Sequence, residues 1–216
     1  MKGIIWFRND IRLEDNETLI RACQECSEVI PVYILDERWL KSDQWGHIRI
    51  GPIRLNFIFQ GLKDLKNQFY YRHGNLLFYI GKPEEILPKL ASRYNVERIY
   101  ALKAYASEEI NVEEAVRAEV PMILYHTSTL IHPDDLPHTI YEIPDIFTDF
   151  RKKIEKFSTV RPPLYKPEKI KTPPLEETKI PSIEDLRFKS IENDSRSVVI
   201  FQGGETQAWK RLNYYF

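Results

Sequence analysis

Residues 29–35 read Val-Ile-Pro-Val-Tyr-Ile-Leu, an almost unbroken apolar run that ends at Asp36. A strand with one exposed face alternates apolar and polar side chains, whereas a strand buried on both faces is apolar throughout. This stretch therefore predicts an inner strand of a parallel sheet that helices cover on both faces.

Four further apolar segments flank this run and alternate with helical patterns. We predict the other strands at residues 3–8, 76–80, 98–102 and 121–125. Helices are predicted between the strands, from Asn16 as N-cap to Cys26, from Gly51-Pro52, from Pro83, and from Ser107 as N-cap. Five such units in succession predict that residues 1–130 form a Rossmann-like α/β domain, a doubly wound five-stranded parallel sheet of order 3-2-1-4-5 with helices on both faces.

Residues 131–216 have a different character. Six prolines fall between residues 162 and 181, a density that excludes a regular helix or sheet and predicts a Pro-rich, extended connector. Apolar side chains at helical spacing predict a short helix from Asp145 and another around Trp209. The last helical pattern stops at Phe216, so we expect the connector to lead to a further segment.

Composition excludes several classes of protein. The 216 residues include 32 acidic and 31 basic side chains, for a net charge of −1, so any contact with nucleic acid must come from a local patch. The basic run from Arg151 to Lys171 is one candidate, although a solvated helix face and connector explains it better. No apolar run approaches the ~20 residues of a membrane span, and the N-terminus has no signal-peptide core. We expect a cytoplasmic protein without a membrane partner.

The two cysteines, Cys23 and Cys26, form a C-x-x-C pair. A zinc site needs a second pair of ligands, and no two histidines in the sequence have ligand spacing. A redox pair needs a helix N-terminus to lower its thiol pKa, whereas these residues come near the end of a predicted helix. We therefore predict ordinary reduced cysteines and no metal site.

Polar residues follow the strands on both sides of the point where the strand order reverses, which is where doubly wound sheets bind ligands. The candidates are Arg8, Asn9 and Asp10 after the first strand, Asp36, Arg38 and Trp39 after the second, and Lys103 and Tyr105 after the fourth. They predict a pocket for a flat, heteroatom-rich ligand; the alternative is that Asn9, Asp10 and Arg12 form a turn and an internal ion pair. The first turn has no G-x-G-x-x-G, so a dinucleotide is not expected there, and no catalytic set can be assembled from spacing.

Three stretches together resemble one family. Residues 6–16 (Trp-Phe-Arg-Asn-Asp-Ile-Arg-Leu-Glu-Asp-Asn) resemble the opening signature of the DNA photolyase/cryptochrome family. Residues 144–151 (Pro-Asp-Ile-Phe-Thr-Asp-Phe-Arg) and 201–206 (Phe-Gln-Gly-Gly-Glu-Thr), with Arg211-Leu212 and Tyr215-Phe216 beyond, are similar to its DASH-type cryptochromes. The matches span the chain in the family's order.

The resemblance implies a particular role. In this family an N-terminal α/β domain is joined by a connector to a helical domain that binds FAD, and the excited flavin splits pyrimidine dimers by electron donation. DASH members are similar to photolyases that act mainly on single-stranded DNA, or to photoreceptors. This chain would be the first domain, with the missing helical domain and, through the full-length protein, DNA as partners. It would contain no catalytic residues and would be inactive alone.

The resemblance also implies an antenna pigment, often a folate, on the α/β domain. Folate-binding relatives place a carboxylate just after the fourth strand, where this chain has Ala104, and a methyl group leaves the pterin N–H donors without partners. Similarity to other branches leaves open a deazaflavin or flavin antenna near Asp36, Trp39, Gly51 and Arg54. The alternatives are a stand-alone Rossmann-like module that binds a nucleotide or a protein without photochemistry, and a purely structural domain.

Overall fold

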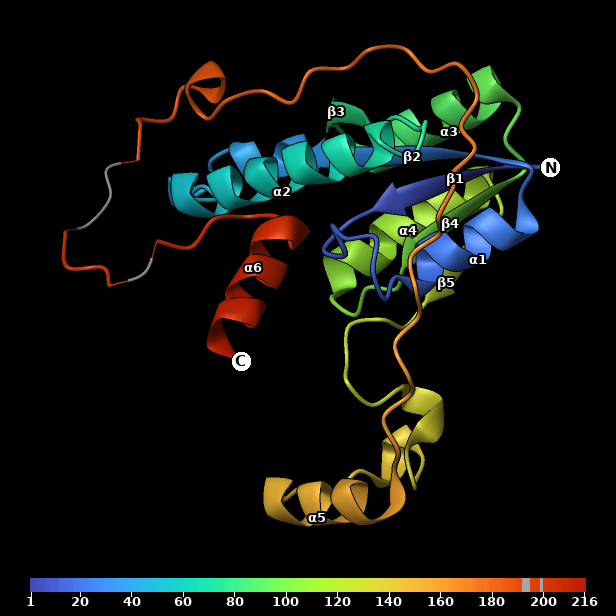
Figure 1. Cartoon of the computed structure of the whole chain (residues 1–216), viewed down its shortest axis with the longest axis vertical. Helices are drawn as coiled ribbons and strands as arrows, with labels where there is room; N and C mark the ends of the chain where they lie inside the picture. The colour runs from blue at the N-terminus through green and yellow to red at the C-terminus, as the bar shows by residue number, and fades with distance from the viewer. Residues whose placement is uncertain (192–194, 199) are drawn as a thin grey trace.

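A computed structural model describes residues 1–191, 195–198 and 200–216. Its centre is a sheet of five strands in the order β3-β2-β1-β4-β5, every neighbouring pair parallel (Figure 1), which confirms the predicted fold class and strand order. The strands are β1 Lys2–Phe7, β2 Glu28–Asp36, β3 Leu77–Gly81, β4 Arg98–Leu102 and β5 Met122–Tyr125.

Helices cover both faces of this sheet. The helices of the domain are α1 Glu17–Glu25, α2 Pro52–Tyr70, α3 Pro83–Tyr94 and α4 Ser107–Glu119. One apolar layer joins α1 and α2 to strand residues such as Phe7 and Tyr33, and a second joins α3 and α4 to strand residues such as Trp6 and Val32. Neighbouring residues of β1 and β2 therefore point into opposite layers, which is why the 29–35 run is apolar throughout.

Local interactions determine where the helices begin, and one predicted helix start is wrong. Asn16 caps α1 by accepting a hydrogen bond from the Leu19 N–H at 3.0 Å, and Pro52 and Pro83 open α2 and α3. The prediction that Ser107 caps α4 is wrong: Ser107 is already helical, and Ala106 is the extended residue before it. The first turn of α4 has no side-chain cap and instead carries Glu108 and Glu109, which complement the positive end of the helix dipole.

The connector is packed although it has no regular structure from residue 158 to 182. Its residues Ile170, Ile180 and Ile183 are buried in the apolar layer of α1 and α2. The Val29 N–H donates to the Lys171 carbonyl at 2.8 Å. Thr178 accepts from the Phe78 N–H at 2.9 Å, and its hydroxyl donates to the Leu76 carbonyl at 3.4 Å. The connector therefore belongs to the core of the sheet domain.

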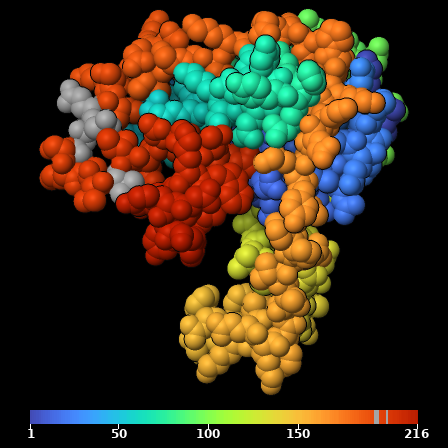
Figure 2. Space-filling model, in the orientation of Figure 1, coloured from blue at the N-terminus to red at the C-terminus, as the bar shows by residue number. Residues whose placement is uncertain are grey.

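Two helices outside the sheet domain expose their apolar side chains. In α5, Phe147–Phe157, and α6, Glu205–Tyr215, no residue of either fully described helix is buried. Figures 1 and 2 show α5 standing away from the sheet domain at the end of an arm, whereas α6 lies against α2. At Gly203, before α6, a Cβ would come 2.1 Å from the Phe57 carbonyl oxygen, so this close approach requires glycine.

The N-terminus of α6 is also bound to the loop after β1, because Glu205 accepts hydrogen bonds from the Leu13 and Glu14 N–H groups at 3.0 and 2.8 Å.

The basic side chains of residues 151–171 are exposed, or half-buried in the case of Lys166, as expected for a solvated face. Within the described ranges, no helix combines the length and the apolar character needed to cross a membrane.

Candidate functional site

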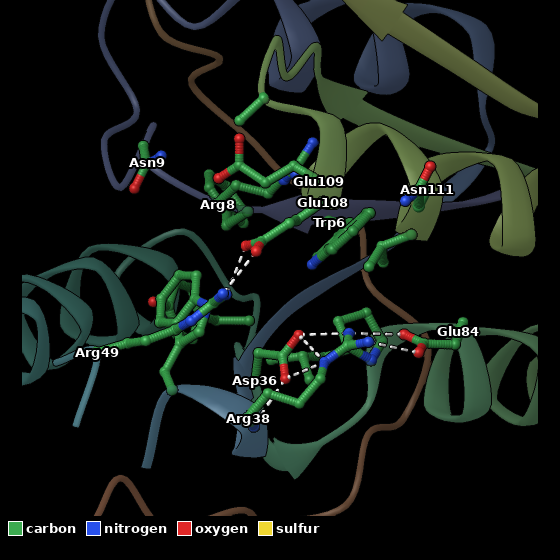
Figure 3. Close-up of a pocket in the computed structure, with 17 residues that line it drawn as sticks. Trp6, Arg8, Asn9, Asp36, Arg38, Arg49, Glu84, Glu108, Glu109 and Asn111 are labelled. Atoms are coloured by element: carbon green, nitrogen blue, oxygen red, sulfur yellow. Dashed lines mark hydrogen bonds and ion pairs between the residues drawn. The ribbon is translucent and has the colours of Figure 1, made fainter. Parts of the chain in front are cut away.

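A cavity of about 580 Å³ lies beyond the carboxyl ends of β1 and β2, where the N-terminal turns of α3 and α4 also meet (Figure 3). Its walls are partly aromatic and partly charged. The residues lining it are Trp6, Phe7, Arg8, Asn9, Tyr33, Ile34, Asp36, Arg38, Trp39, Arg49, Pro83, Glu84, Ala106, Glu108, Glu109, Asn111 and Val112. This is the edge of the sheet at which doubly wound folds bind ligands, and the volume is in the ~300–1,000 Å³ range of small-molecule sites.

The structure brings five of the ten predicted site residues to this cavity, namely Arg8, Asn9, Asp36, Arg38 and Trp39. Lys103 and Tyr105 line a smaller, adjoining cavity of about 160 Å³. Arg54 faces the groove between α2 and α6, with its guanidinium 5.8 Å from the centroid of the Trp39 ring. Asp10 and Gly51 line neither cavity.

Asp10 stabilises a turn after the first strand, as predicted by the alternative to a ligand-binding role. Its carboxylate accepts the Arg8 N–H at 2.9 Å, and its carbonyl accepts from the Asn16 amide at 3.1 Å. Burial raises the pKa of this carboxyl group. The Arg12 side chain donates to the Glu14 and Asp15 carbonyls. These residues form a turn, and the ion pair of this loop is made by Arg8 instead.

Arg8 is held by a partner that is 105 positions away in the sequence. Its guanidinium pairs with the buried Glu113 of α4 and donates to the Leu102 carbonyl at 3.0 Å. Glu113 also accepts the Ala104 N–H at 2.8 Å. The guanidinium lies 4.7 Å from the centroid of the Trp6 ring. Arg8 is therefore a fixed part of the cavity wall, and Glu113 Oε1 already accepts hydrogen bonds from two protein groups.

Three further ion pairs, formed by Arg38 and Arg49, line the cavity and were not predicted from the sequence. Arg38 lies between Asp36, at 2.6 Å, and Glu84, at 3.0 Å, and hydrogen bonding to Asp36 raises the pKa of Arg38. Arg49 pairs with Glu108 at 2.5 Å, which lowers the pKa of Glu108. The sequence feature that could have revealed these pairs is the acidic first turn of α3 and of α4, because both helices begin at this edge of the sheet.

Glu109 differs from the other carboxylates of the cavity. Within the part of the chain that the structure describes, its half-buried side chain has no hydrogen-bond or ion-pair partner. The lining contains three cations (Arg8, Arg38 and Arg49) and four anions (Asp36, Glu84, Glu108 and Glu109), for a net charge of −1. The cavity can therefore receive a flat ring between apolar walls and offer one free carboxylate to an N–H donor of that ring.

The cysteines lie away from the cavity, at the other end of α1. Burial raises the pKa of Cys23 to about 12, and burial also raises the pKa of Cys26. Both thiols are free, and their raised pKa values are unfavourable for thiolate chemistry. Among the described residues, no group of three or more His, Cys, Asp or Glu side chains is arranged to hold a metal ion.

Comparison with known proteins gives a consistent set of similarities. Residues 3–173 match the family model described as DNA photolyase. A cryptochrome DASH of Gloeobacter violaceus is 36% identical over 219 residues, and one of Xenopus laevis is 37% identical over 223. Each alignment covers 99% of this chain but 44% and 43% of those relatives. The chain thus spans less than half of their length.

Solved structures show the same similarity in three dimensions. The crystal structure of a Synechocystis cryptochrome matches with a TM-score of 0.92 and 35% identity, covering 100% of this chain and 46% of that one. A photolyase of the archaeon Sulfolobus tokodaii matches with a TM-score of 0.73 and 25% identity, covering 98% of this chain and 46% of that one. The archaeal protein was solved with two FAD molecules, with the implication of a novel light-harvesting cofactor.

Proposed function

This chain belongs to the DNA photolyase family, and we propose that it is the α/β domain that holds an antenna chromophore beside a helical FAD-binding domain. The observation that carries the proposal is the 580 Å³ cavity at the carboxyl end of the sheet, with its aromatic walls and its unpaired carboxylate. In this role the domain absorbs light and passes the excitation energy to the flavin of the other domain. Its own residues bind and orient the pigment.

A flavin-type ring, either an isoalloxazine or its deaza analogue, fits the residues of the cavity. Trp6, Tyr33 and Trp39 supply apolar and aromatic surface for a flat ring. Glu109 can accept a hydrogen bond from a ring N–H, and Asn9 offers both a donor and an acceptor. Arg8, Arg38 and Arg49 are already paired with carboxylates, so they keep the walls rigid.

A folate does not fit equally well. The position after β4 where folate-binding relatives have a carboxylate is Ala104, and the nearby carboxylate of Glu113 is engaged by Arg8 and by the Ala104 N–H. A pterin at that position would leave buried N–H donors without partners, at a cost of roughly 1–3 kcal/mol each. This comparison supports the flavin or deazaflavin class over the folate class.

The activity of the whole protein follows from the same proposal. A domain of this kind serves a flavoprotein that either repairs pyrimidine dimers with blue light or acts as a cryptochrome photoreceptor. Its partners are the helical FAD domain and, through that domain, single-stranded or dimer-containing DNA. The chain by itself is inactive under this proposal, and light-dependent splitting of dimers by the isolated chain would contradict it.

Binding of an uncharged flavin tests the proposed site directly. The purified chain is titrated with riboflavin, and binding is followed by the quenching of flavin fluorescence next to the cavity tryptophans. We expect saturable one-to-one binding that Glu109→Gln weakens about tenfold, because the N–H donor loses a charged acceptor. Glu114→Gln is the matched control, since Glu114 lies on the same helix, is exposed and does not line the cavity.

Two results would count against this site. Binding that is equally affected by Glu109→Gln and Glu114→Gln would place the flavin elsewhere. Absence of riboflavin binding together with tight binding of an adenine nucleotide would favour the stand-alone nucleotide-binding module. Circular dichroism of each variant establishes that the fold is retained.

A further inference from the structure

The smaller cavity adjoins the larger one and is a separate compartment. The two share Arg8, Asn9, Ala106 and Glu109, and the smaller one continues past them to Lys103 and Ser128. Its volume of about 160 Å³ is below the ~300 Å³ minimum of sites for drug-sized ligands. It is about five times the ~30 Å³ that a water molecule occupies in the liquid. It can accept a small substituent such as a phosphate group but not the three-ring system of a flavin.

Lys103 gives this compartment a charge that the larger cavity lacks. Every arginine of the two linings has a carboxylate partner: Arg8 pairs with Glu113, Arg38 with Asp36 and Glu84, and Arg49 with Glu108. Lys103 is half-buried at the end of β4 and, among the residues described in the structure, its ammonium group has no hydrogen-bond or ion-pair partner. It is thus the available cation of the combined site.

A hydrogen bond between two other side chains lies close to Lys103. The Tyr105 hydroxyl and the Nδ1 of His126 are 2.6 Å apart. Burial lowers the pKa of His126, and the charge of Lys103 lowers it further. A neutral His126 does not compete for an anion, so the positive charge in this compartment comes from Lys103.

Resting on the proposed function, we propose that the smaller cavity binds the anionic end of the chromophore's side chain through Lys103. The ligand class is then a flavin or deazaflavin whose side chain carries a phosphate, with the ring in the larger cavity. A phosphate monoester carries about −1.5 to −2 charges at pH 7. The lining of the larger cavity has a net charge of −1, whereas the lining of the smaller one, with Arg8, Lys103 and Glu109, has a net charge of +1 and favours the phosphate. Lys103 is the group in reach that can neutralise it.

Riboflavin and flavin mononucleotide form a matched pair of probes, because they differ by one phosphate. Both are titrated into the full 216-residue chain at low and at high salt. We expect flavin mononucleotide to bind about tenfold tighter than riboflavin, and this advantage should shrink at high salt as the charges are screened. Lys103→Gln should abolish the advantage without changing riboflavin binding, and Lys103→Arg should restore part of it. Lys89→Gln, an exposed lysine of α3 outside both cavities, is the control.

The outcomes separate this inference from the proposed function. Equal binding of the two flavins, unaltered by Lys103→Gln, would overturn the role of Lys103 and leave the ring site intact. A parallel loss of riboflavin and flavin mononucleotide binding in Lys103→Gln would also overturn it, because the effect would not depend on the phosphate. Absence of binding by either flavin would overturn the ring site and the phosphate site together. A folate that binds tighter than pteroic acid would show that the anion subsite serves a glutamate carboxylate instead.

Discussion

The sheet domain of residues 1–130 and the segment of residues 131–216 use their apolar side chains in opposite ways. In the first region, side chains such as Phe7 and Phe59 are buried in the apolar layer between the sheet and its helices. In the second, α5 and α6 leave most of theirs exposed, for example Phe147 at 72% exposure. The connector between these helices nevertheless contributes three buried isoleucines to the sheet domain. The second region is therefore partly a component of the first and partly a pair of apolar faces suited to another domain.

The largest expected difference between the two regions is in the stability change when one phenylalanine side chain in each is shortened to alanine. Phe59 is 1% exposed and packs edge-to-face on Phe78 at a centroid distance of 5.9 Å. We expect Phe59→Ala to lower the free energy of unfolding by about 3–5 kcal/mol. Phe147→Ala should change it by less than about 0.5 kcal/mol, since its side chain is already solvated. Urea denaturation of both variants measures this, and similar losses would show that α5 is packed in solution.

A change in the connector tests whether this segment belongs to the sheet domain. Ile170 is a residue of the connector, and its side chain is only 1% exposed. We expect Ile170→Ala to cost about 2 kcal/mol, at the lower end of the range for buried isoleucine because an irregular segment can relax into the space. Val160→Ala, at an exposed position of the same connector, is the control. The variant should also be cut faster in the connector by trypsin; unchanged stability and an unchanged cleavage rate would contradict packing of this segment.

At alkaline pH we expect a smaller loss of stability, which arises from titratable groups buried in the sheet domain and not from exposed groups of the second region. Burial raises the pKa of Cys23 from its ordinary value of 9.0 to about 12 and also raises the pKa values of Tyr33 and Tyr100. Above pH 9 the unfolded chain releases these protons while the folded chain retains them, so the stability falls as the pH rises. Cys23 alone accounts for about 1 kcal/mol by pH 10.

Thermal unfolding between pH 8 and 10.5 measures this slope. Cys23→Ala should flatten it, whatever the constant cost of the lost thiol. Tyr214→Phe, at an exposed position of α6, should leave it unchanged. A slope that is the same in the wild type and in Cys23→Ala would show that this thiol ionises as readily in the folded chain as in the unfolded one.

The sequence was sufficient to predict the fold, because doubly buried strands and amphipathic helices leave direct patterns in the residue order. Asn16 and the prolines at positions 52 and 83 mark helix starts through local chemistry that a few residues determine. The Ser107 cap was mispredicted because Ala106 provides the extended backbone one residue earlier, and residue type alone does not distinguish the two positions.

The site was less predictable because its interactions join segments that are far apart. Arg8 and Asp36 could be placed at the correct edge from strand ends alone. Glu113, which pairs with Arg8, and Glu84, which pairs with Arg38, come from other helices, 105 and 46 positions further along the chain, so no local sequence pattern indicates these pairs. Lys103 was identified as a candidate, but its separation into a second compartment depends on how the first turn of α4 divides the crevice.

The contact of Thr178 with β3 has a consequence for behaviour at high concentration. The strand β3 lies at one edge of the sheet, and an edge strand offers unpaired backbone groups to the strands of other molecules. The connector occupies two of these groups, since the Thr178 hydroxyl accepts from the Phe78 N–H and donates to the Leu76 carbonyl. Release of the connector would thus expose the β3 edge to pairing with strands of other molecules, as well as loosen the core.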